Sequence, residues 1–197
     1  MTENRTIFAN GTKPLLLFVF TAMFSALTAV CAWVQIPAFF GLVPFTMQTF
    51  GVFAALLFLG GKYGSLSVAV YLLLGLAGVP VFSGFRGGVG VLAGVTGGYI
   101  TGFLLGALAY WGLEALFCRK SRFSLPARIF ALTVCLLVCY LFGTCWFALL
   151  HEGALNAVTF GGALSTCVLP FLIPDLIKMS LALLLHKKLA PVLHKQR

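Results

Sequence analysis

Two ionisable residues lie in an otherwise apolar stretch near the end of the chain. Asp175 and Lys178 fall in the segment PFLIPDLIKMSLA, three residues apart, so they share one face of a helix. Because charge near the centre of a bilayer is costly, such residues normally pair with one another or face a polar cavity. Pro170 and Pro174 each leave a helix carbonyl without its amide donor just before the pair. A broken helix is tolerated where it lines a cavity, which favours a binding site over a purely structural ion pair.

A third charged residue, Arg86, stands in the glycine-rich segment SGFRGGVG, residues 83–90. Glycines allow a loop backbone to approach a ligand closely. The segment has neither the Gly-Lys-Ser/Thr ending of a phosphate-binding loop nor a dinucleotide-binding pattern. The arginine is therefore either a ligand contact or a solvated or lipid-headgroup contact. A cavity containing Asp175, Lys178 and Arg86 would carry a net charge of +1 and would suit a small monoanion.

The composition places these residues in a membrane protein. Of 197 residues, 61% are apolar and 9% are charged, whereas a soluble domain of this length needs about a quarter charged residues. A spanning helix takes about 20 apolar residues, so six spans use about 120. This leaves no room for a folded aqueous catalytic domain. Any energised work must draw on a partner or an ion gradient.

The basic residues predict the orientation of the bundle. With six crossings, eleven of the thirteen fall on one side, which the positive-inside rule assigns to the cytoplasm together with both termini. They are Arg5, Lys13, Lys62, Arg119, Lys120, Arg122, Arg128, Lys187, Lys188, Lys195 and Arg197. The net charge of +9 thus reflects topology and not nucleic-acid binding.

The apolar runs predict a single integral membrane domain over 1–197, an all-α bundle of six transmembrane helices. The spans are expected at roughly 15–36, 45–59, 64–78, 90–116, 129–150 and 164–186, with the second and third forming a tight hairpin around residues 60–64 (GGKYG).

Small residues recur at helical spacing in two of these spans. Gly94, Gly98, Gly102 and Gly106 share one face, which favours close packing within the protein. Ala22, Ala26 and Ala29 form a similar stripe in the first span. That stripe serves either internal packing or the docking of another membrane protein.

The cysteines suggest a rival class, an intramembrane quinone or thiol oxidoreductase using Cys135 and Cys139, which share a helix face. No Cys-x-x-Cys or His-Glu-x-x-His pattern is present, and Asp175 is the only carboxylate that we expect to be buried. We therefore expect cysteines that act as small apolar residues and no metal site. A purely structural assembly subunit is a third possibility. It would tolerate joint apolar replacement of Asp175 and Lys178.

Three segments together resemble the BioY family, the substrate-binding (S) components of biotin transporters of the energy-coupling factor (ECF) type. They are VPFTMQTFGV at 43–52, GVPVFSGFRGGVGVLAGVTGGYITGF at 78–103 and PFLIPDLIK at 170–178. Phe85 and Pro174 depart from the pattern, which usually has a small residue and a glycine there. The resemblance implies a six-helix bundle with both termini cytoplasmic. It also implies capture of biotin from outside, and in most members a coupling membrane protein and two ATPase subunits as partners.

The resemblance also assigns residues to roles. Arg86, Asp175 and Lys178 would belong to the biotin pocket, with Gln48 and Tyr99 as further polar contacts or, alternatively, interfacial anchors, and Ala22 and Ala26 would face the coupling protein. Biotin offers a carboxylate to the cations and a ureido ring whose N–H groups suit an aspartate. Which cation takes the carboxylate stays open.

The expected function is therefore biotin uptake across the bacterial cytoplasmic membrane, without enzymatic chemistry or a cofactor. The alternative within transport is an S component for another vitamin or small anion.

Overall fold

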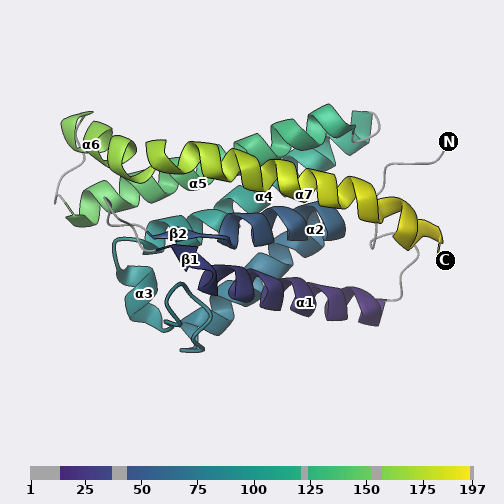
Figure 1. The fold of residues 1–197 in the computed structure, drawn as a ribbon, viewed down its shortest axis with the longest axis horizontal. Helices are drawn as coiled ribbons and strands as arrows, with labels where there is room; N and C mark the ends of the chain where they lie inside the picture. Colours follow the sequence, from purple (N-terminus) through teal and green to yellow (C-terminus); the bar gives the residue numbers. More distant parts are fainter. Residues whose placement is uncertain (1–13, 37–43, 121–123, 152–156, 196–197) are drawn as a thin grey trace.

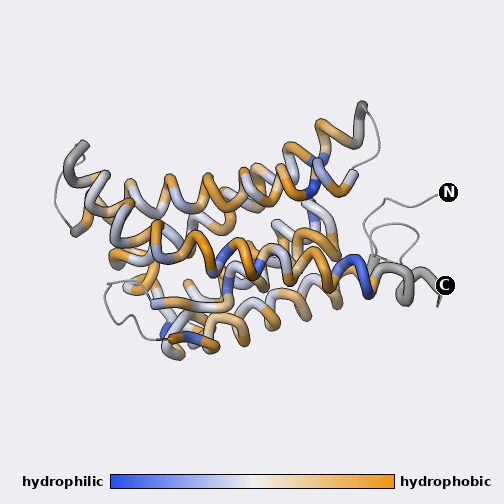
Figure 2. Tube along the Cα trace, turned by 45° about the horizontal axis from the view of Figure 1, so that its top comes forward, coloured by the Kyte–Doolittle hydropathy of each residue, from blue (hydrophilic) through white to orange (hydrophobic). Residues whose placement is uncertain are grey.

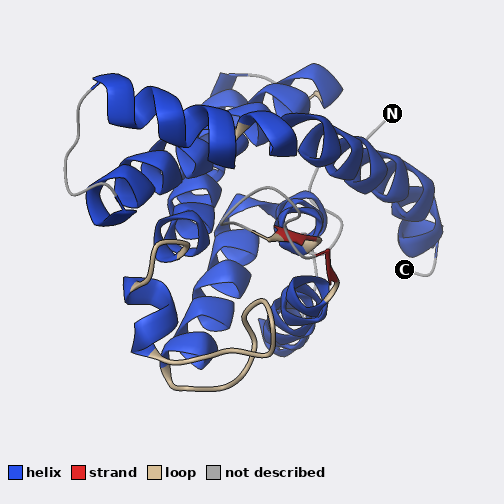
Figure 3. Ribbon diagram, turned by 60° about the vertical axis from the view of Figure 1, so that its left-hand side comes forward, coloured by secondary structure: helices blue, strands red, loops and turns tan. Residues whose placement is uncertain are grey.

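The computed structural model describes residues 14–36, 44–120, 124–151 and 157–195, and they form an almost entirely helical bundle (Figure 1). The helices are α1 (Pro14–Trp33), α2 (Gln48–Leu76), α3 (Val89–Ala93), α4 (Gly97–Lys120), α5 (Leu125–His151), α6 (Ala157–Cys167) and α7 (Leu169–Lys195). Two short strands, β1 (Gln35–Ile36) and β2 (Phe45–Thr46), pair as an antiparallel ribbon in which Gln35 faces Thr46. The ribbon and α3 lie toward one end of the bundle, away from the end where α1 begins and α7 ends (Figure 1). Figure 3 shows the two short strands in red among the helices.

Five helices, α1, α2, α4, α5 and α7, are long and apolar enough to cross a membrane. Hydrophobic residues recur along all of these helices (Figure 2), and many of them are exposed. On α7, for example, Leu169, Ile173 and Ile177 are all exposed. A surface of this kind suits lipid and not water, so the chain is a multi-pass membrane protein.

Helix α2 reverses direction within its own length. Gly60 has non-helical torsion angles (φ 81°, ψ 173°), which an L side chain rarely adopts. The Nε2 atom of Gln48 donates to the hydroxyl of Tyr71 at 2.7 Å, although 23 residues separate them. A Cβ on Gly64 would lie 2.8 Å from Leu56 Cα. The two halves, 48–59 and 61–76, are therefore antiparallel. The reversal takes a single residue and not the five-residue turn predicted over 60–64.

Two predicted spans are divided in the structure. The span expected at 90–116 consists of α3 and α4, because Gly94 is extended (ψ 174°) and ends α3. The span expected at 164–186 consists of the end of α6 and most of α7, which separate at Val168. The helix therefore breaks before both prolines. Pro170 is the second residue of α7, where its missing amide has no helical carbonyl to meet, and Pro174 lies inside the helix.

Glycines bring α4 and α5 close together. Gly98, Gly102 and Gly106 all face α5. A Cβ on Gly98 would lie 2.2 Å from Trp146 Cβ. A Cβ on Gly102 would lie 3.1 Å from the Cys139 carbonyl oxygen, and one on Gly106 2.4 Å from the Cys135 carbonyl oxygen. This part of the predicted glycine face serves internal packing. Gly94, the fourth predicted member, lies outside α4.

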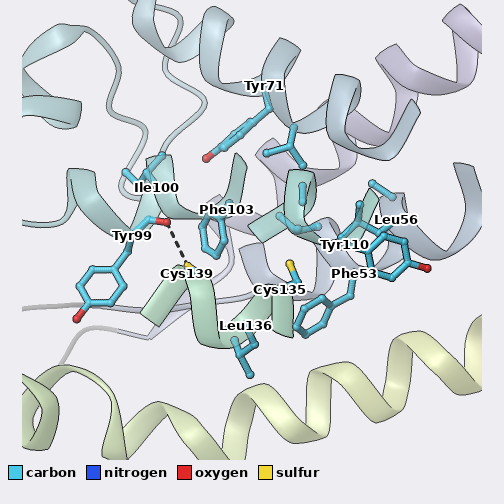
Figure 4. Packing of buried hydrophobic residues seen from close by; sticks show 14 of the residues in the cluster. Phe53, Leu56, Tyr71, Tyr99, Ile100, Phe103, Tyr110, Cys135, Leu136 and Cys139 are labelled. Carbon is cyan, nitrogen blue, oxygen red and sulfur yellow. Dashed lines mark hydrogen bonds between the residues drawn. The ribbon is translucent and has the colours of Figure 1, made fainter. Parts of the chain in front are cut away.

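The main hydrophobic core lies where α2, α4 and α5 meet (Figure 4). Phe53, Tyr71 and Tyr110 are among its largest fully buried side chains. Cys135 and Cys139 are buried in the same cluster, beside the α4 glycines. Among the described residues no group of three His, Cys, Asp or Glu side chains could hold a metal ion.

Candidate substrate-binding site

A cavity lies between α2, α4, α5 and α7 and the loop that precedes α3. It contains about 720 Å³ of atom-free space, part of it continuous with solvent. All five residues that the sequence analysis proposed as ligand contacts line it, namely Gln48, Arg86, Tyr99, Asp175 and Lys178. Most of the remaining lining is apolar, including Phe82, Ile100, Phe103, Leu136 and Phe171. An apolar cavity with a few polar groups is the ordinary form of a small-molecule site.

Asp175 and Lys178 form an ion pair within the cavity wall. Their spacing on α7 brings Lys178 Nζ to 2.7 Å from Asp175 Oδ1. The side chain of Asp175 is only 5% exposed and that of Lys178 only 9%. Lys178 Nζ also donates to the main-chain oxygen of Thr46 at 2.7 Å, which connects α7 to β2. The two alternatives posed by the sequence are thus compatible, because the residues pair with each other and also line the cavity.

Tyr140 on α5 completes this group and is not among the residues predicted from the sequence. Its hydroxyl donates to Asp175 Oδ2 at 2.5 Å, so both carboxylate oxygens accept a hydrogen bond from the protein. Tyr140 itself lines the cavity. A buried tyrosine hydroxyl usually has a hydrogen-bond partner, so a tyrosine within an apolar helix indicates a polar contact. The spacing of 35 residues gave no indication that the partner is Asp175.

Gln48 begins α2 and is buried. Its side-chain oxygen accepts from Thr46 Oγ1 at 2.9 Å, and its side-chain nitrogen donates to Tyr71 at 2.7 Å. Both ends of the amide are therefore oriented by neighbours. Burial and these contacts fit a cavity residue better than an interfacial anchor.

Tyr99 lies in the first turn of α4 and forms part of the opposite wall. Its hydroxyl lies 3.2 Å from Thr144 Oγ1 on α5. Its main-chain oxygen accepts from Cys139 Sγ at 3.4 Å, the contact drawn as a dashed line in Figure 4. The residue is buried, so it too is a wall residue.

Arg86 lies in a tight turn between α2 and α3. Phe82 N donates to the Arg86 main-chain oxygen at 2.9 Å, which closes the turn. Arg86 Nε donates to the Ser83 main-chain oxygen at 3.1 Å. Within the described part of the chain, the terminal guanidinium nitrogens of this exposed residue have no hydrogen-bond partner. Because Asp175 and Lys178 neutralise each other, Arg86 gives the cavity its net positive charge.

A further carboxylate corrects the prediction that Asp175 alone lies inside the bundle. Glu114 on α4 is half-buried, so Asp175 is not the only carboxylate inside the apolar helices. Its Oε2 accepts from Gly61 N at 2.5 Å, directly after the reversal of α2. Glu114 does not line the cavity. It pairs with a main-chain amide freed by the reversal, which sequence spacing alone did not reveal.

An apolar cavity with one internal ion pair and one additional cation, inside a multi-pass helical bundle, defines a membrane protein that binds a small ligand. The sequence pattern of the BioY family matches residues 4–195. The chain therefore belongs to the BioY family.

Individual relatives agree with this assignment. A probable biotin transporter BioY of Pyrococcus horikoshii is 39% identical over 168 residues, covering 85% of this chain and 92% of that protein. The biotin transporter BioY of Thermotoga maritima is 56% identical over 85 residues, which span 43% of this chain and only 49% of that protein. The crystal structure of an S-component for biotin from an ECF-type ABC transporter superposes with a TM-score of 0.71. It has 25% sequence identity and covers 89% of this chain and 90% of that one.

These similarities confirm the helical S-component-like fold and place the chain among transporters and not among enzymes. The oxidoreductase interpretation is therefore set aside. Cys135 and Cys139 instead contribute to the contact with α4.

Proposed function

We propose that this chain is a biotin-binding S component that captures biotin from the outer side of the bacterial cytoplasmic membrane and delivers it inward. The observation that carries the proposal is the convergence of Arg86, Asp175 and Lys178 on one cavity in a BioY-family chain. Biotin is a monoanion at neutral pH, and the net charge of these three groups is +1.

The hydrogen bonds support one orientation of the ligand. Lys178 already donates to Asp175 and to Thr46, whereas the terminal nitrogens of Arg86 remain available within the described part of the chain. A guanidinium binds a carboxylate with two parallel hydrogen bonds. Arg86 therefore takes the biotin carboxylate.

The ureido ring then lies at the other end of the cavity. Each oxygen of Asp175 retains a lone pair for a ureido N–H, and Lys178 retains one N–H for the ureido carbonyl. The aliphatic tail lies between these ends, against Phe82 and Phe103. This arrangement makes use of every charged group in the cavity.

The proposed topology is a single domain over 1–197 with six crossings and both termini in the cytoplasm. It treats the antiparallel halves of α2 as two crossings. The first half has only 12 residues and a length of about 18 Å. Such a short segment is tolerated because α2 is buried within the bundle.

The proposed partners are an ECF coupling membrane protein and two ATPase subunits, which supply the energy that this chain cannot. Ala22 and Ala26 on α1 are exposed, whereas Ala29 is buried. Small exposed side chains on a membrane helix allow close approach of another helix. The coupling protein therefore docks on this face of α1.

The test is equilibrium binding of labelled biotin to the purified full-length chain and to two variants. We expect Arg86→Ala and Asp175→Asn each to weaken binding by about tenfold or more, because each loses a charge-assisted hydrogen bond. Unchanged affinity in both variants would overturn the site assignment. No binding by the unmodified chain would overturn the function, and a competition panel of other vitamins and small anions would then identify the ligand class.

A further inference from the structure

The turn that carries Arg86 is attached to the end of α1 by three side-chain contacts. Trp33 Nε1 donates to the Pro80 main-chain oxygen at 3.0 Å. The Trp33 ring stacks on the Phe85 ring, with centroids 4.9 Å apart and planes inclined by 26°. Ser83 Oγ donates to Gln35 Oε1 on β1. All three join segments about 50 residues apart in the sequence.

Phe85 adopts a backbone conformation that its side chain disfavours. Its φ of 55° follows the positive φ of 72° at Gly84, and Phe85 is the only described non-glycine residue with positive φ. Such a conformation costs free energy and persists only when surrounding contacts enforce it. The side chain is 63% exposed and does not line the cavity. Neither core packing nor ligand contact therefore explains this residue, whereas stacking on Trp33 does.

The orientation of Arg86 depends on the turn. Its one described side-chain hydrogen bond, from Nε to the Ser83 oxygen, stays within the same turn. Trp33 and Gln35 attach this turn to the end of α1 and to β1. A displacement of the turn from α1 would therefore carry the guanidinium away from the cavity as one unit.

We propose that Trp33 and Phe85 form an aromatic clasp that positions Arg86 over the cavity and slows the escape of the bound anion. Both are positioning residues, since neither lines the cavity and both act through Arg86. The inference rests on the proposed function, because the anion is the biotin carboxylate. It adds a role for the end of α1 that is separate from the docking face at Ala22 and Ala26.

The experiment measures the dissociation rate of labelled biotin from the purified full-length chain. Trp33→Leu and Phe85→Gly should each accelerate dissociation by about three- to tenfold, the range expected for loss of a stacked aromatic pair. Phe85→Tyr retains the aromatic ring, so biotin should dissociate from it at the same rate as from the unmodified chain. Val89→Ala is the matched control, because Val89 is equally exposed at 63%, lies beside the same loop and does not line the cavity.

Phe85→Gly separates positioning from folding. Glycine adopts positive φ without strain, so the thermal midpoint of this variant should be unchanged or higher while biotin leaves faster. In an Arg86→Ala background the same substitution should have no further effect on dissociation. Unaltered dissociation in both clasp variants, or an effect that persists fully without Arg86, would overturn the clasp.

Hydrogen–deuterium exchange of residues 79–88 gives a readout that needs no ligand. Phe82 N donates within the turn and Gly88 N donates to Gly75, so faster exchange is expected in Trp33→Leu than in Val89→Ala. Equal exchange would overturn the clasp independently of biotin. Absence of biotin binding by the unmodified chain would instead overturn the proposed function, so the two failures are distinguishable.

Discussion

Removal of the Lys178 ammonium provides a sharp test of the buried ion pair. In Lys178→Met, Asp175 Oδ1 loses its donor and the Thr46 carbonyl loses the 2.7 Å contact, while Tyr140 remains on Oδ2. Breaking one partner of a buried pair costs about 3–5 kcal/mol of folding free energy, because a charge is left uncompensated. We expect a loss of this size and no detectable biotin binding.

The double variant Asp175→Asn/Lys178→Met is the matched comparison. It removes both charges, so most of the lost stability should return, since a neutral replacement of a buried pair is often tolerated. Biotin binding should remain absent, because the ureido ring has lost both partners. Denaturant unfolding in detergent gives the stability, and labelled biotin gives the affinity.

Two results would refute this reasoning. If Lys178→Met is as stable as the unmodified chain, the pair is not buried as the 5% and 9% exposures indicate. If the double variant regains biotin binding together with stability, the pair is only structural, which is the alternative posed from the sequence.

Further predictions concern the cavity wall, the helix contacts and the partner face. Tyr140→Phe should weaken biotin binding by about tenfold in equilibrium measurements, because Asp175 loses a donor; unchanged affinity would show that this hydroxyl does not orient the carboxylate. Gly106→Val should lower the free energy of unfolding by about 1–3 kcal/mol, the usual cost of overpacking, because its Cβ would lie 2.4 Å from a main-chain oxygen of α5. Gly112→Ala, where nothing lies within 4 Å, is its control and should be neutral or stabilising in the same assay. Ala22→Leu with Ala26→Leu should abolish co-purification with an ECF coupling protein but leave biotin binding unchanged; retained co-purification would place the docking face elsewhere.

The chemistry of the cavity could be predicted where it depended on local spacing or on unusual composition. Asp175 and Lys178 stand out because charge is rare in this chain, and their separation of three residues fixes their shared face. Arg86 stands out because it is isolated in a glycine-rich loop. The assignment of Gln48 and Tyr99 to the site depended on the resemblance to a known family. All five line the cavity, and their ligand roles remain predictions.

Contacts between distant segments could not be predicted in this way. Nothing in the spacing of the chain pairs Tyr140 with Asp175, or directs Lys178 to a main-chain oxygen in β2. Main-chain acceptors carry no residue-type signal at all. Glu114 falls within the span predicted at 90–116, so its place in a helix could be predicted, but its pairing with the amide of Gly61 could not.

Element boundaries were missed where the break comes from backbone torsion and not from composition. Gly94 was interpreted as one of four packing glycines, although its extended conformation ends α3. The break at Val168 precedes the prolines that indicated it. Hydropathy runs smoothly across both breaks, so apolar periodicity merges the pieces into single spans.

The glycine contacts between α4 and α5 should make this wall of the cavity more rigid than the wall formed by α7 and the Arg86 turn. Main-chain atoms meet directly along this seam, so the two helices should behave as one rigid body. The Arg86 turn and the α7 wall are held instead by individual side-chain contacts, of Trp33 with Phe85 and of Lys178 with Thr46. We therefore expect a ligand to enter and leave by movement of α7 or of the Arg86 turn relative to the α4–α5 pair.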